Sequence, residues 1–511
     1  MARLHLTLAA VASFALVSGC RKDAPDAHAA VAVDAGSGVK TDLVFLVTGA
    51  ENGYLLPTID EAGAHGGAAE VLSRWVEKDG HCVGSLGPNG ESACANGNTV
   101  VLSTGDNANG QAISGYFKGE PTAEVMRLMG YAGSAFGNRE LDWNRDQLLA
   151  NTKRGGFPYL AANVIVKSEE GRALGLQPYR LVTRRGVTVA VVGLAARKAT
   201  WTPMPGRMNG LEVVPDDVAL GVAIPAARKD GADVVVVVTD GCLHELPELL
   251  TAHPDWRPAF VAGRDCEAEY PEKVGDTRLV YPGRHFNGYA RVTVSVDTGR
   301  PPPERVTAVA PAFVDVVTKD NVPAPEPRTK ALIAGWKEKL DAALGERIGF
   351  SKSGIEQESP QMSQWLTTAL KEQFKTDVAL LNRRGVRQGL PAGPITKASV
   401  WDLIPFENEV VVAKVKGDAL LAALENVEAR AAGVKAKGDG FVDAKGAPIT
   451  ADKTYTVATL DYLYLGGDGF KLLAADPAAT QTKTSWQQAL IDWTAAKKSD
   501  EKKPLEALLG K

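Results

Sequence analysis

Charged and amide side chains follow several short apolar runs in this 511-residue sequence, at the points where the runs end. Asp106 comes after one run, Asp240 after a run composed almost entirely of valine, and Arg264 after a third. The ends of strands are where α/β proteins place their active sites, so these residues are candidates for one shared site. Carboxylate oxygens suit hard divalent cations, whereas a guanidinium keeps its positive charge and disfavours them. The chemistry of such a site therefore depends on which charges dominate it.

One stretch in this group is distinctive. Residues 136–142 read Phe-Gly-Asn-Arg-Glu-Leu-Asp, directly after a short apolar run. The stretch closely resembles the Gly-Asn-His-Glu-Phe-Asp block of calcineurin-like metallophosphatases, in their secreted 5′-nucleotidase branch. In that block the Asn is a metal ligand and the His is the catalytic imidazole. The resemblance places Asn138 at the ligand, Arg139 at the catalytic His and Asp142 at the final Asp.

Two more blocks of that family match residues that follow the apolar runs at 42–48 and 99–103. The first is Asp-x-His-Gly in the family, and here Ala50 stands at the Asp and Asn52 at the His. Alanine cannot ligate a metal, and an amide is a weaker ligand than imidazole. The second block, Gly-Asp, is intact, and the resemblance implies that Asp106 bridges two metal ions.

The last two blocks are also altered. Asp240 stands at the His that ends the fourth block. Arg264 and Cys266 replace the ligands of the fifth block, which is Gly-His-x-His or Gly-His-x-Gln in the family. Asp106 and Asn138 are therefore the family ligands that are unchanged, and none of the family's histidines remains.

Family members use two divalent cations to activate a water and to neutralise charge on the phosphate under attack. Arg139 and Arg264 would place permanent positive charge there, and each would repel a cation by several kcal/mol at an effective dielectric of about 20. We therefore expect the two-metal site to be lost, with no cofactor, and the guanidinium groups to pair with the nearby aspartates. The alternative is an altered site that holds one weakly bound metal (Mn, Zn, Mg or Ca) on Asp106, Asn138 and Asp240.

The N-terminus predicts export and lipid attachment. Arg3 precedes an apolar run over residues 6–16 that is too short to be a stable membrane span. Residues 17–20, Val-Ser-Gly-Cys, resemble a bacterial lipobox, so residues 1–20 are predicted to be a lipoprotein signal peptide with Cys20 as the lipidated residue. An ordinary secretory signal is the alternative. Residues 21–39 suit a flexible tether, and the expected location is the cell envelope, anchored in a membrane at the periplasmic face or the cell surface.

Export to an oxidising compartment permits disulfides between the other four cysteines. Cys82 and Cys94 flank Gly-Pro-Asn-Gly and Asn-Gly turn signals, which favours a disulfide that closes a surface loop. Cys242 and Cys266 follow the strand ends that carry the altered metal ligands. Three interpretations stay open for this pair: a disulfide, two free thiols, or a soft-metal site that includes His244.

The segments that must position these residues alternate between apolar strands and helices. Strands are predicted at residues 42–48, 99–103, 159–166, 187–193, 232–238 and 258–262, and helices at 68–78 and 122–128. This alternation indicates an α/β domain. With the resemblance, it implies a four-layer α-β-β-α metallophosphatase sandwich over residues 40–320.

Proline-rich stretches mark a boundary after this domain, at residues 301–303 and 323–327. A charged helix is predicted at 329–344, inside a linker region of residues 321–345. Residues 346–511 then form a second α/β unit that resembles the family's C-terminal 5′-nucleotidase domain. In it we predict strands at 378–381, 409–415 and 454–459, a helix at 362–374, and a helical tail at 485–509 with a solvated lysine-rich face.

The second unit contains a loop that the family uses for phosphate. Residues 382–387, Asn-Arg-Arg-Gly-Val-Arg, match the family's Asn-Gly-Gly-Gly-Ile-Arg, whose last Arg binds the substrate phosphate. The resemblance gives that role to Arg387. Arg383 and Arg384 replace two glycines, which changes how closely the loop can approach a ligand.

The same unit carries residues at the family's nucleoside-binding positions. Phe406 and Tyr462 fall where two aromatic rings clamp the base, Asn408 where a side chain bonds to the base, and Asp468 where a carboxylate accepts from the ribose hydroxyls. The alternative is that both aromatic residues are kept for core packing. The polar partners that accompany them favour ligand binding.

The net charge of −4 gives no argument for a nucleic-acid partner. The partners that we expect are a nucleoside or nucleotide-like small molecule and, through the lipid, a membrane. The resemblance implies the hydrolysis of nucleotide phosphate esters as the family's role. We predict that this chain keeps ligand binding but has lost efficient hydrolysis. Two alternatives are an active phosphoesterase with an altered site and a structural or partner-binding envelope protein.

Overall fold

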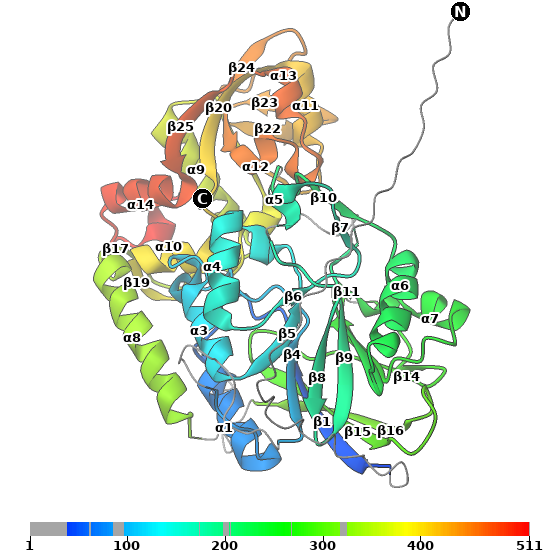
Figure 1. Cartoon of the computed structure of the whole chain (residues 1–511). Helices are drawn as coiled ribbons and strands as arrows, with labels where there is room; N and C mark the ends of the chain where they lie inside the picture. The colour runs from blue at the N-terminus through cyan, green and yellow to red at the C-terminus, as the bar shows by residue number, and fades with distance from the viewer. Residues whose placement is uncertain are drawn as a thin grey trace, which may run out of the picture. The chain divides into compact units, whose positions relative to one another are not determined.

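The computed structural model describes residues 38–60, 63–84, 97–172, 174–197, 204, 206–266, 268–316 and 324–509. From Gly38 onward the chain forms one compact unit, which contains two α/β domains (Figure 1). The predicted lipidation site Cys20, the signal peptide, most of the tether and Cys94 lie outside the described residues. Within the part of the chain that is described, none of the helices combines the length and the apolar character needed to cross a bilayer.

The N-terminal domain is built on two six-stranded mixed sheets. The first has the order β16 (Val306–Asp315), β15 (Gly288–Asp297), β1 (Lys40–Thr48), β4 (Thr99–Ser103), β5 (Tyr131–Ala135) and β6 (Tyr159–Leu160). The second has the order β13 (Lys273–Val274), β14 (Thr277–Val280), β12 (Phe260–Arg264), β11 (Val234–Cys242), β9 (Val187–Leu194) and β8 (Tyr179–Arg184).

Successive side chains of a strand point to opposite faces of the sheet, which explains how the two sheets and the helices pack into layers. Phe45 and Val47 of β1 point into the core between the sheets, where the rings of Phe45 and Phe260 meet edge to face with centroids 5.1 Å apart. Leu46, between them, points to the opposite face and packs against helices. In β11, Val236 likewise faces the other sheet.

Helices cover the outer face of each sheet (Figure 1). The first sheet is covered by α1 (Ala68–Asp79), α3 (Glu120–Leu128), α4 (Arg145–Gly155) and α8 (Pro327–Leu344), and the second by α6 (Asp216–Lys229) and α7 (Pro247–Ala252). The layers are therefore α-β-β-α, as predicted. Smaller elements of this domain are β2 (Thr58–Asp60), β3 (Gly63–His65), α2 (Ala112–Gly115) and α5 (Glu169–Arg172).

One predicted strand is wrong. Residues 159–166 form two short strands, because the chain turns after β6 and β7 (Val164–Val166) pairs with β10 (Leu211–Val213) in a separate two-stranded sheet. The turn is held by Asn163, a fully buried side chain that donates to the main-chain oxygen of Ala195 and accepts from its amide, each at 2.8 Å. A buried amide with these partners fixes the turn more strongly than the apolar pattern favours a continuous strand.

The C-terminal domain follows α8 and has a mixed five-stranded sheet at its centre. Its order is β21 (Ala429–Ala432), β18 (Val378–Asn382), β24 (Thr454–Leu460), β20 (Glu409–Lys416) and β25 (Thr480–Ser485). Two strand pairs accompany it, β17 (Arg347–Ser351) with β19 (Gly393–Thr396) and β22 (Val434–Lys437) with β23 (Gly440–Asp443). The helices are α9 (Pro360–Phe374), α10 (Lys397–Leu403), α11 (Gly417–Leu424), α12 (Asp461–Tyr464), α13 (Leu472–Ala475), α14 (Trp486–Lys497) and α15 (Leu505–Leu508).

The tail is not the single helix that the sequence predicts. Helix α14 ends at Lys497, and Lys498 adopts a left-handed conformation with φ 51°. Asp500 Oδ1 then accepts from the amides of Lys502 and Lys503, and Pro504 precedes α15. These local hydrogen bonds compete with helix continuation and separate the two helices.

Candidate functional site

The candidate residues lie at the carboxyl ends of the parallel strands in both sheets of the N-terminal domain. Strands β1, β4 and β5 run parallel, as do β9, β11 and β12. Asp106 follows β4 with φ 55°, and Ala50 and Asn52 follow β1 with φ 48° and 47°. Left-handed backbone at residues other than glycine is strained and tends to occur at functional sites. The strand ends are therefore held in a specific, locally costly geometry.

Arg264 joins the two candidate carboxylates that come from different sheets. Its Nη1 lies 3.3 Å from Asp106 Oδ2 and 3.4 Å from Asp240 Oδ1. Both carboxylates are buried, with side-chain exposures of 5% and 1%. Burial, together with the charge of Asp106, raises the pKa of Asp240 well above its usual value, although Arg264 opposes the rise. One guanidinium therefore serves two carboxylates, and Asp240 Oδ2 has no partner among the described residues.

Arg139 contacts Asp106 and Asp142 in different ways. Its main-chain amide donates to Asp106 Oδ1 at 3.0 Å, and its Nη1 lies 3.4 Å from Asp142 Oδ2. Asn109 Nδ2 also donates to Asp142 Oδ2, at 2.8 Å. Burial alone would lower the pKa of Arg139, but the charges of Asp142 and Asp106 outweigh it and raise that pKa. The guanidinium is thus fixed in its charged form beside Asp142.

Glu140 is a site residue that the sequence analysis did not single out. It is 3% exposed, and its Oε1 and Oε2 accept from the amides of Asn107 and Gly137 at 2.8 and 2.9 Å. Burial, followed by the charge of Asp106, raises the pKa of Glu140 to about 8. Glu140 therefore ties the loop after β4 to the loop after β5. The signal that could have identified Glu140 is its position inside residues 136–142, the block that resembles the family.

Two of the positions that the family resemblance implies for metal ligands, Asp106 and Asp240, contact a guanidinium in this arrangement. The nearest carboxylate oxygens of Asp106 and Asp240 are directed at the guanidinium of Arg264. In the described ranges, no cluster of three or more His, Cys, Asp or Glu side chains is placed to hold a metal ion. Asn138, the other unchanged ligand position, is buried, and its Nδ2 has no partner among the described residues.

Cys242 and Cys266 form a disulfide beside this cluster, with an S–S distance of 2.05 Å and Cα atoms 5.6 Å apart. The bond joins the end of β11 to the loop after β12, and Cys242 pairs with Arg264 in the strand register. Of the three interpretations that the sequence left open, free thiols and a thiolate site with His244 are therefore excluded in this structure. Cys82 also takes part in a disulfide, whereas Cys94 lies outside the described residues.

A cavity of about 440 Å³ brings the candidates of both domains together. From the N-terminal domain it is lined by Asp106, Asn138, Arg139, Asp142 and Arg264. From the C-terminal domain it is lined by Arg387, Phe406, Asn408, Tyr462 and Asp468. Asp240 lies behind Arg264 and is not part of the lining. Among the other lining residues are Asn109, Trp143 and Arg207, for which the sequence pattern contained no signal.

Phe406 faces guanidinium groups in this cavity. The Cζ of Arg139, from the other domain, lies 4.7 Å from the centroid of the Phe406 ring, and the Cζ of Arg387 lies 5.9 Å from it. The ring is half-buried and also packs against the core of its own domain. The two interpretations of Phe406, ligand contact and core packing, therefore both describe part of its surroundings.

The polar groups at the predicted nucleoside positions bond to one another. Asp468 accepts from Tyr462 Oη at 2.9 Å and from Asn382 Nδ2 at 2.7 Å, one on each carboxylate oxygen. Asn408 Nδ2 donates to Asp461 Oδ1 at 2.8 Å. These bonds orient the side chains along the cavity wall, and a ligand would share or replace them.

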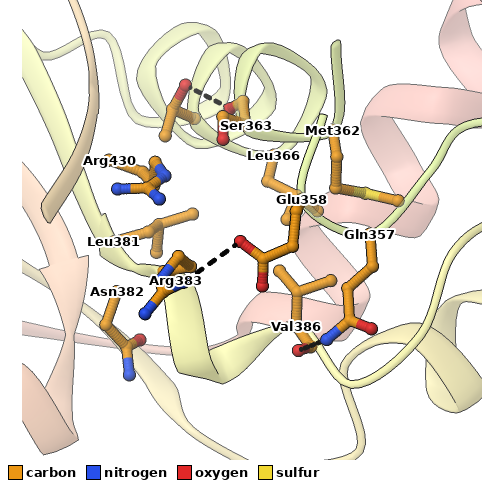
Figure 2. A pocket seen from close by; sticks show the side chains of 11 residues that line it. Gln357, Glu358, Met362, Ser363, Leu366, Leu381, Asn382, Arg383, Val386 and Arg430 are labelled. Carbon is orange, nitrogen blue, oxygen red and sulfur yellow. Dashed lines mark hydrogen bonds and ion pairs between the residues drawn. The ribbon is translucent and has the colours of Figure 1, made fainter. Parts of the chain in front are cut away.

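The two arginines that replace glycines in the phosphate loop share Glu428 as a partner, but only Arg384 lines the main cavity. Arg383 Nη2 lies 3.5 Å from Glu428 Oε1, and its Nη1 lies 3.5 Å from Glu358 Oε2, beside a narrow pocket on α9 (Figure 2). Arg384 lines the main cavity and pairs with Glu428, with Nε and Oε1 3.2 Å apart. Gln357 Nε2 donates to the main-chain oxygen of Val386 at 2.9 Å, and this hydrogen bond holds the loop in place. The loop therefore keeps Arg387 directed into the main cavity despite both substitutions.

Comparisons with known proteins agree with this architecture. Residues 342–475 match the family described as 5′-nucleotidase, C-terminal domain. The UshA protein of Yersinia enterocolitica is 26% identical over 455 residues, which cover 76% of this chain and 82% of that protein. A 5′-nucleotidase of Vibrio cholerae is 23% identical over 468 residues, which cover 78% of this chain and 83% of that protein.

The fold has a close counterpart among solved structures. The 5′-nucleotidase precursor of Thermus thermophilus superposes with a TM-score of 0.71 at 20% identity, over 90% of this chain and 97% of that one. Together with the strand-end blocks and the two-domain architecture, these matches establish the relationship. The chain belongs to the 5′-nucleotidase family of phosphoesterases, with a calcineurin-like phosphoesterase domain followed by a 5′-nucleotidase C-terminal domain.

Proposed function

We propose that this chain is an envelope nucleotide-binding member of the 5′-nucleotidase family that does not hydrolyse its ligand efficiently. The observation that carries the proposal is the position of Arg264, whose Nη1 lies within 3.4 Å of both Asp106 and Asp240. A guanidinium there satisfies the two carboxylates that would otherwise attract a cation. Arg139 stands at the catalytic His and cannot act as a general base, because it stays protonated.

Ligand binding is supported by the intact cavity between the domains. Arg387, Phe406, Asn408, Tyr462 and Asp468 all line it, at the positions that the resemblance assigns to phosphate and nucleoside. Relatives carry the name 5′-nucleotidase, which supports a nucleoside or nucleotide as the class of ligand. Aromatic rings accompanied by placed polar groups are a recurring feature of small-molecule sites.

A second candidate is an active phosphoesterase with a single metal. Asp240 Oδ2 and Asn138 Nδ2 have no partners among the described residues, although both side chains are buried. Rotation of the Asn138 amide would direct its oxygen toward an ion, and Asp106 would supply another ligand oxygen. This arrangement could hold one divalent ion (Mn, Zn, Mg or Ca) if Arg264 moved away.

Metal content and phosphate release separate the two candidates. We expect purified protein to contain well under one divalent ion per chain by mass spectrometry, and to release no phosphate from nucleoside monophosphates above background. Asp106→Ala should then leave the phosphate release unchanged. A metal-dependent release that Asp106→Ala abolishes would overturn the proposal in favour of the second candidate.

The ion pairs of Arg264 give an independent test. Arg264→Gln removes the ion-pair partner of two buried carboxylates, a loss that typically costs about 3–5 kcal/mol, so the free energy of unfolding should fall by that order. Arg300→Gln, which removes an exposed partner of Asp297, is the matched control and should change stability by less than about 1 kcal/mol. An unchanged stability in Arg264→Gln with one bound metal ion per chain would show that a cation can replace the guanidinium.

A thermal shift distinguishes a binding protein from a structural envelope protein. We expect adenosine or its phosphates to raise the melting temperature, and Phe406→Ala to reduce the shift. The absence of a shift with every nucleoside and nucleotide tested would favour the structural alternative. Membrane attachment is part of the same proposal, and Cys20→Ser should move the protein from the membrane fraction to the soluble fraction.

A further inference from the structure

The cavity between the domains is lined by five guanidinium groups. Arg139, Arg207, Arg264, Arg384 and Arg387 all reach its wall. Three of these have carboxylate partners: Arg139 pairs with an aspartate, Arg264 with two, and Arg384 with a glutamate. For Arg387 the described residues provide no carboxylate within ion-pair distance, and its guanidinium is accessible from the cavity.

Arg139 and Arg387 come from different domains but lie against the same ring. Their Cζ atoms are 4.7 and 5.9 Å from the centroid of Phe406. Like charges in a partly enclosed space repel each other, and the repulsion is larger there than in bulk water. An anion that contacts both groups would remove this repulsion. A phosphate has oxygens enough to accept from two guanidinium groups at once.

The orientation of Arg139 is already fixed for this purpose. Asp142 Oδ2 lies 3.4 Å from its Nη1 and is itself held by Asn109 Nδ2 at 2.8 Å. A guanidinium has five N–H donors, so this single contact leaves others for a ligand. Because Arg139 needs no reorganisation to bind, little conformational entropy would be lost on ligand binding.

We propose that Arg139 and Arg387 form a phosphate-binding site that works without a metal ion, with Phe406 as the surface on which both guanidinium groups rest. The proposal rests on the proposed function and makes it more specific, because it gives Arg139 a binding role in place of the catalytic one. The new element is Arg139, because the resemblance already gives the phosphate role to Arg387.

Titration calorimetry of the full chain in the presence of EDTA tests this site. The probes are adenosine 5′-monophosphate, adenosine and inorganic phosphate. We expect the monophosphate to bind at least about tenfold more tightly than adenosine. Arg139→Gln and Arg387→Gln should each remove most of this preference while leaving the affinity for adenosine within about twofold. Arg139→Lys, which keeps a positive charge, should retain part of the preference.

Arg300→Gln is the matched control, because it removes the same charge from an exposed arginine that does not line the cavity. Its preference for the monophosphate should equal that of the unmodified chain. Near-ultraviolet circular dichroism checks that each variant is folded, and Arg139→Lys provides the comparison if Arg139→Gln is not.

The possible outcomes separate the two proposals. If neither adenosine nor its monophosphate binds, the proposed function fails and this site fails with it. If both bind equally, and Arg139→Gln changes neither affinity, the phosphate site is wrong while the binding function stands. If the monophosphate binds only when a divalent cation replaces EDTA, a metal-independent site is excluded.

Discussion

Glu51 is a carboxyl group that the fold buries completely, next to the strand end that carries Ala50. Its Oε2 accepts from the amide of Phe286 at 2.6 Å, and its Oε1 has no partner among the described residues. Burial raises the pKa of Glu51 to about 8, against the lowering effect of its hydrogen bonds. The charge of ionised Glu51, in turn, contributes to the raised pKa values of Tyr131 and Tyr281. Glu51 is therefore protonated in the folded protein at neutral pH.

The pH dependence of stability follows from this carboxyl group. The unfolded chain loses the Glu51 proton near pH 4.5, and the folded chain loses it near pH 8. The stability that the protonated Glu51 contributes is therefore complete below pH 4.5 and is lost as the pH rises to about 8. Each pKa unit between the two values corresponds to about 1.4 kcal/mol in the free energy of unfolding. In Glu51→Gln, urea unfolding between about pH 5 and 9 should show a weaker fall in stability. Parallel curves for the two proteins would contradict this assignment. Glu140, whose pKa is also about 8, should keep part of the dependence.

Single residues differ in how far the sequence could predict them. The pairing of Arg264 with Asp106 and Asp240 could be predicted because buried carboxylates need a counter-charge, and strand ends bring the three residues to one edge. The contact between Arg139 and Phe406 could not, because the two residues lie in different domains and their distance depends on how the domains meet. Ligand, metal and lipid roles of the candidate residues stay predictions.

At the scale of elements, the disulfide between β11 and the loop after β12 has a measurable effect. It closes a loop with a sequence separation of 24 residues, and the lost entropy of the unfolded chain corresponds to about 3 kcal/mol. The double variant Cys242→Ser/Cys266→Ser should be destabilised by that order in urea. Adding reductant to the double variant should lower its stability no further, apart from any contribution of the disulfide at Cys82. A change below about 0.5 kcal/mol in the double variant would show that the loop is already ordered without the bond.

The strands of the N-terminal domain could be predicted because dense β-branched runs have few alternatives in a buried sheet. Two elements could not. The strand predicted at residues 159–166 is interrupted by the buried bonds of Asn163, whose partner Ala195 is distant in sequence. The C-terminal helix is interrupted at Lys498, a residue type that gives no sign of a left-handed conformation.

At the scale of the whole molecule, Asp402 of α10 connects the two domains. Its Oδ1 accepts from the amide of Ala112, at 2.6 Å, at the first residue of α2. Nearby, the rings of Tyr116 and Trp401 meet edge to face with centroids 5.3 Å apart. Asp402→Ala should weaken this interface by about 1–3 kcal/mol, because it leaves a buried amide without an acceptor.

Scanning calorimetry measures this effect. We expect Asp402→Ala to separate the unfolding of the two domains into two transitions, or to lower the first transition by several degrees. Asp439→Ala, an exposed change in the turn between β22 and β23, is the control and should leave the profile unchanged. A single unshifted transition in Asp402→Ala would show that this hydrogen bond contributes little to the interface.

The cavity lies between walls contributed by both domains, so a molecule bound inside it would touch both at once. Its apparent dissociation constant then includes the fraction of chains whose domains are already closed, and it rises as that fraction falls. A variant far from the cavity, such as Asp402→Ala, would weaken binding without altering any group that contacts the ligand. Reciprocally, saturating ligand would hold the domains together and hide the defect of that variant.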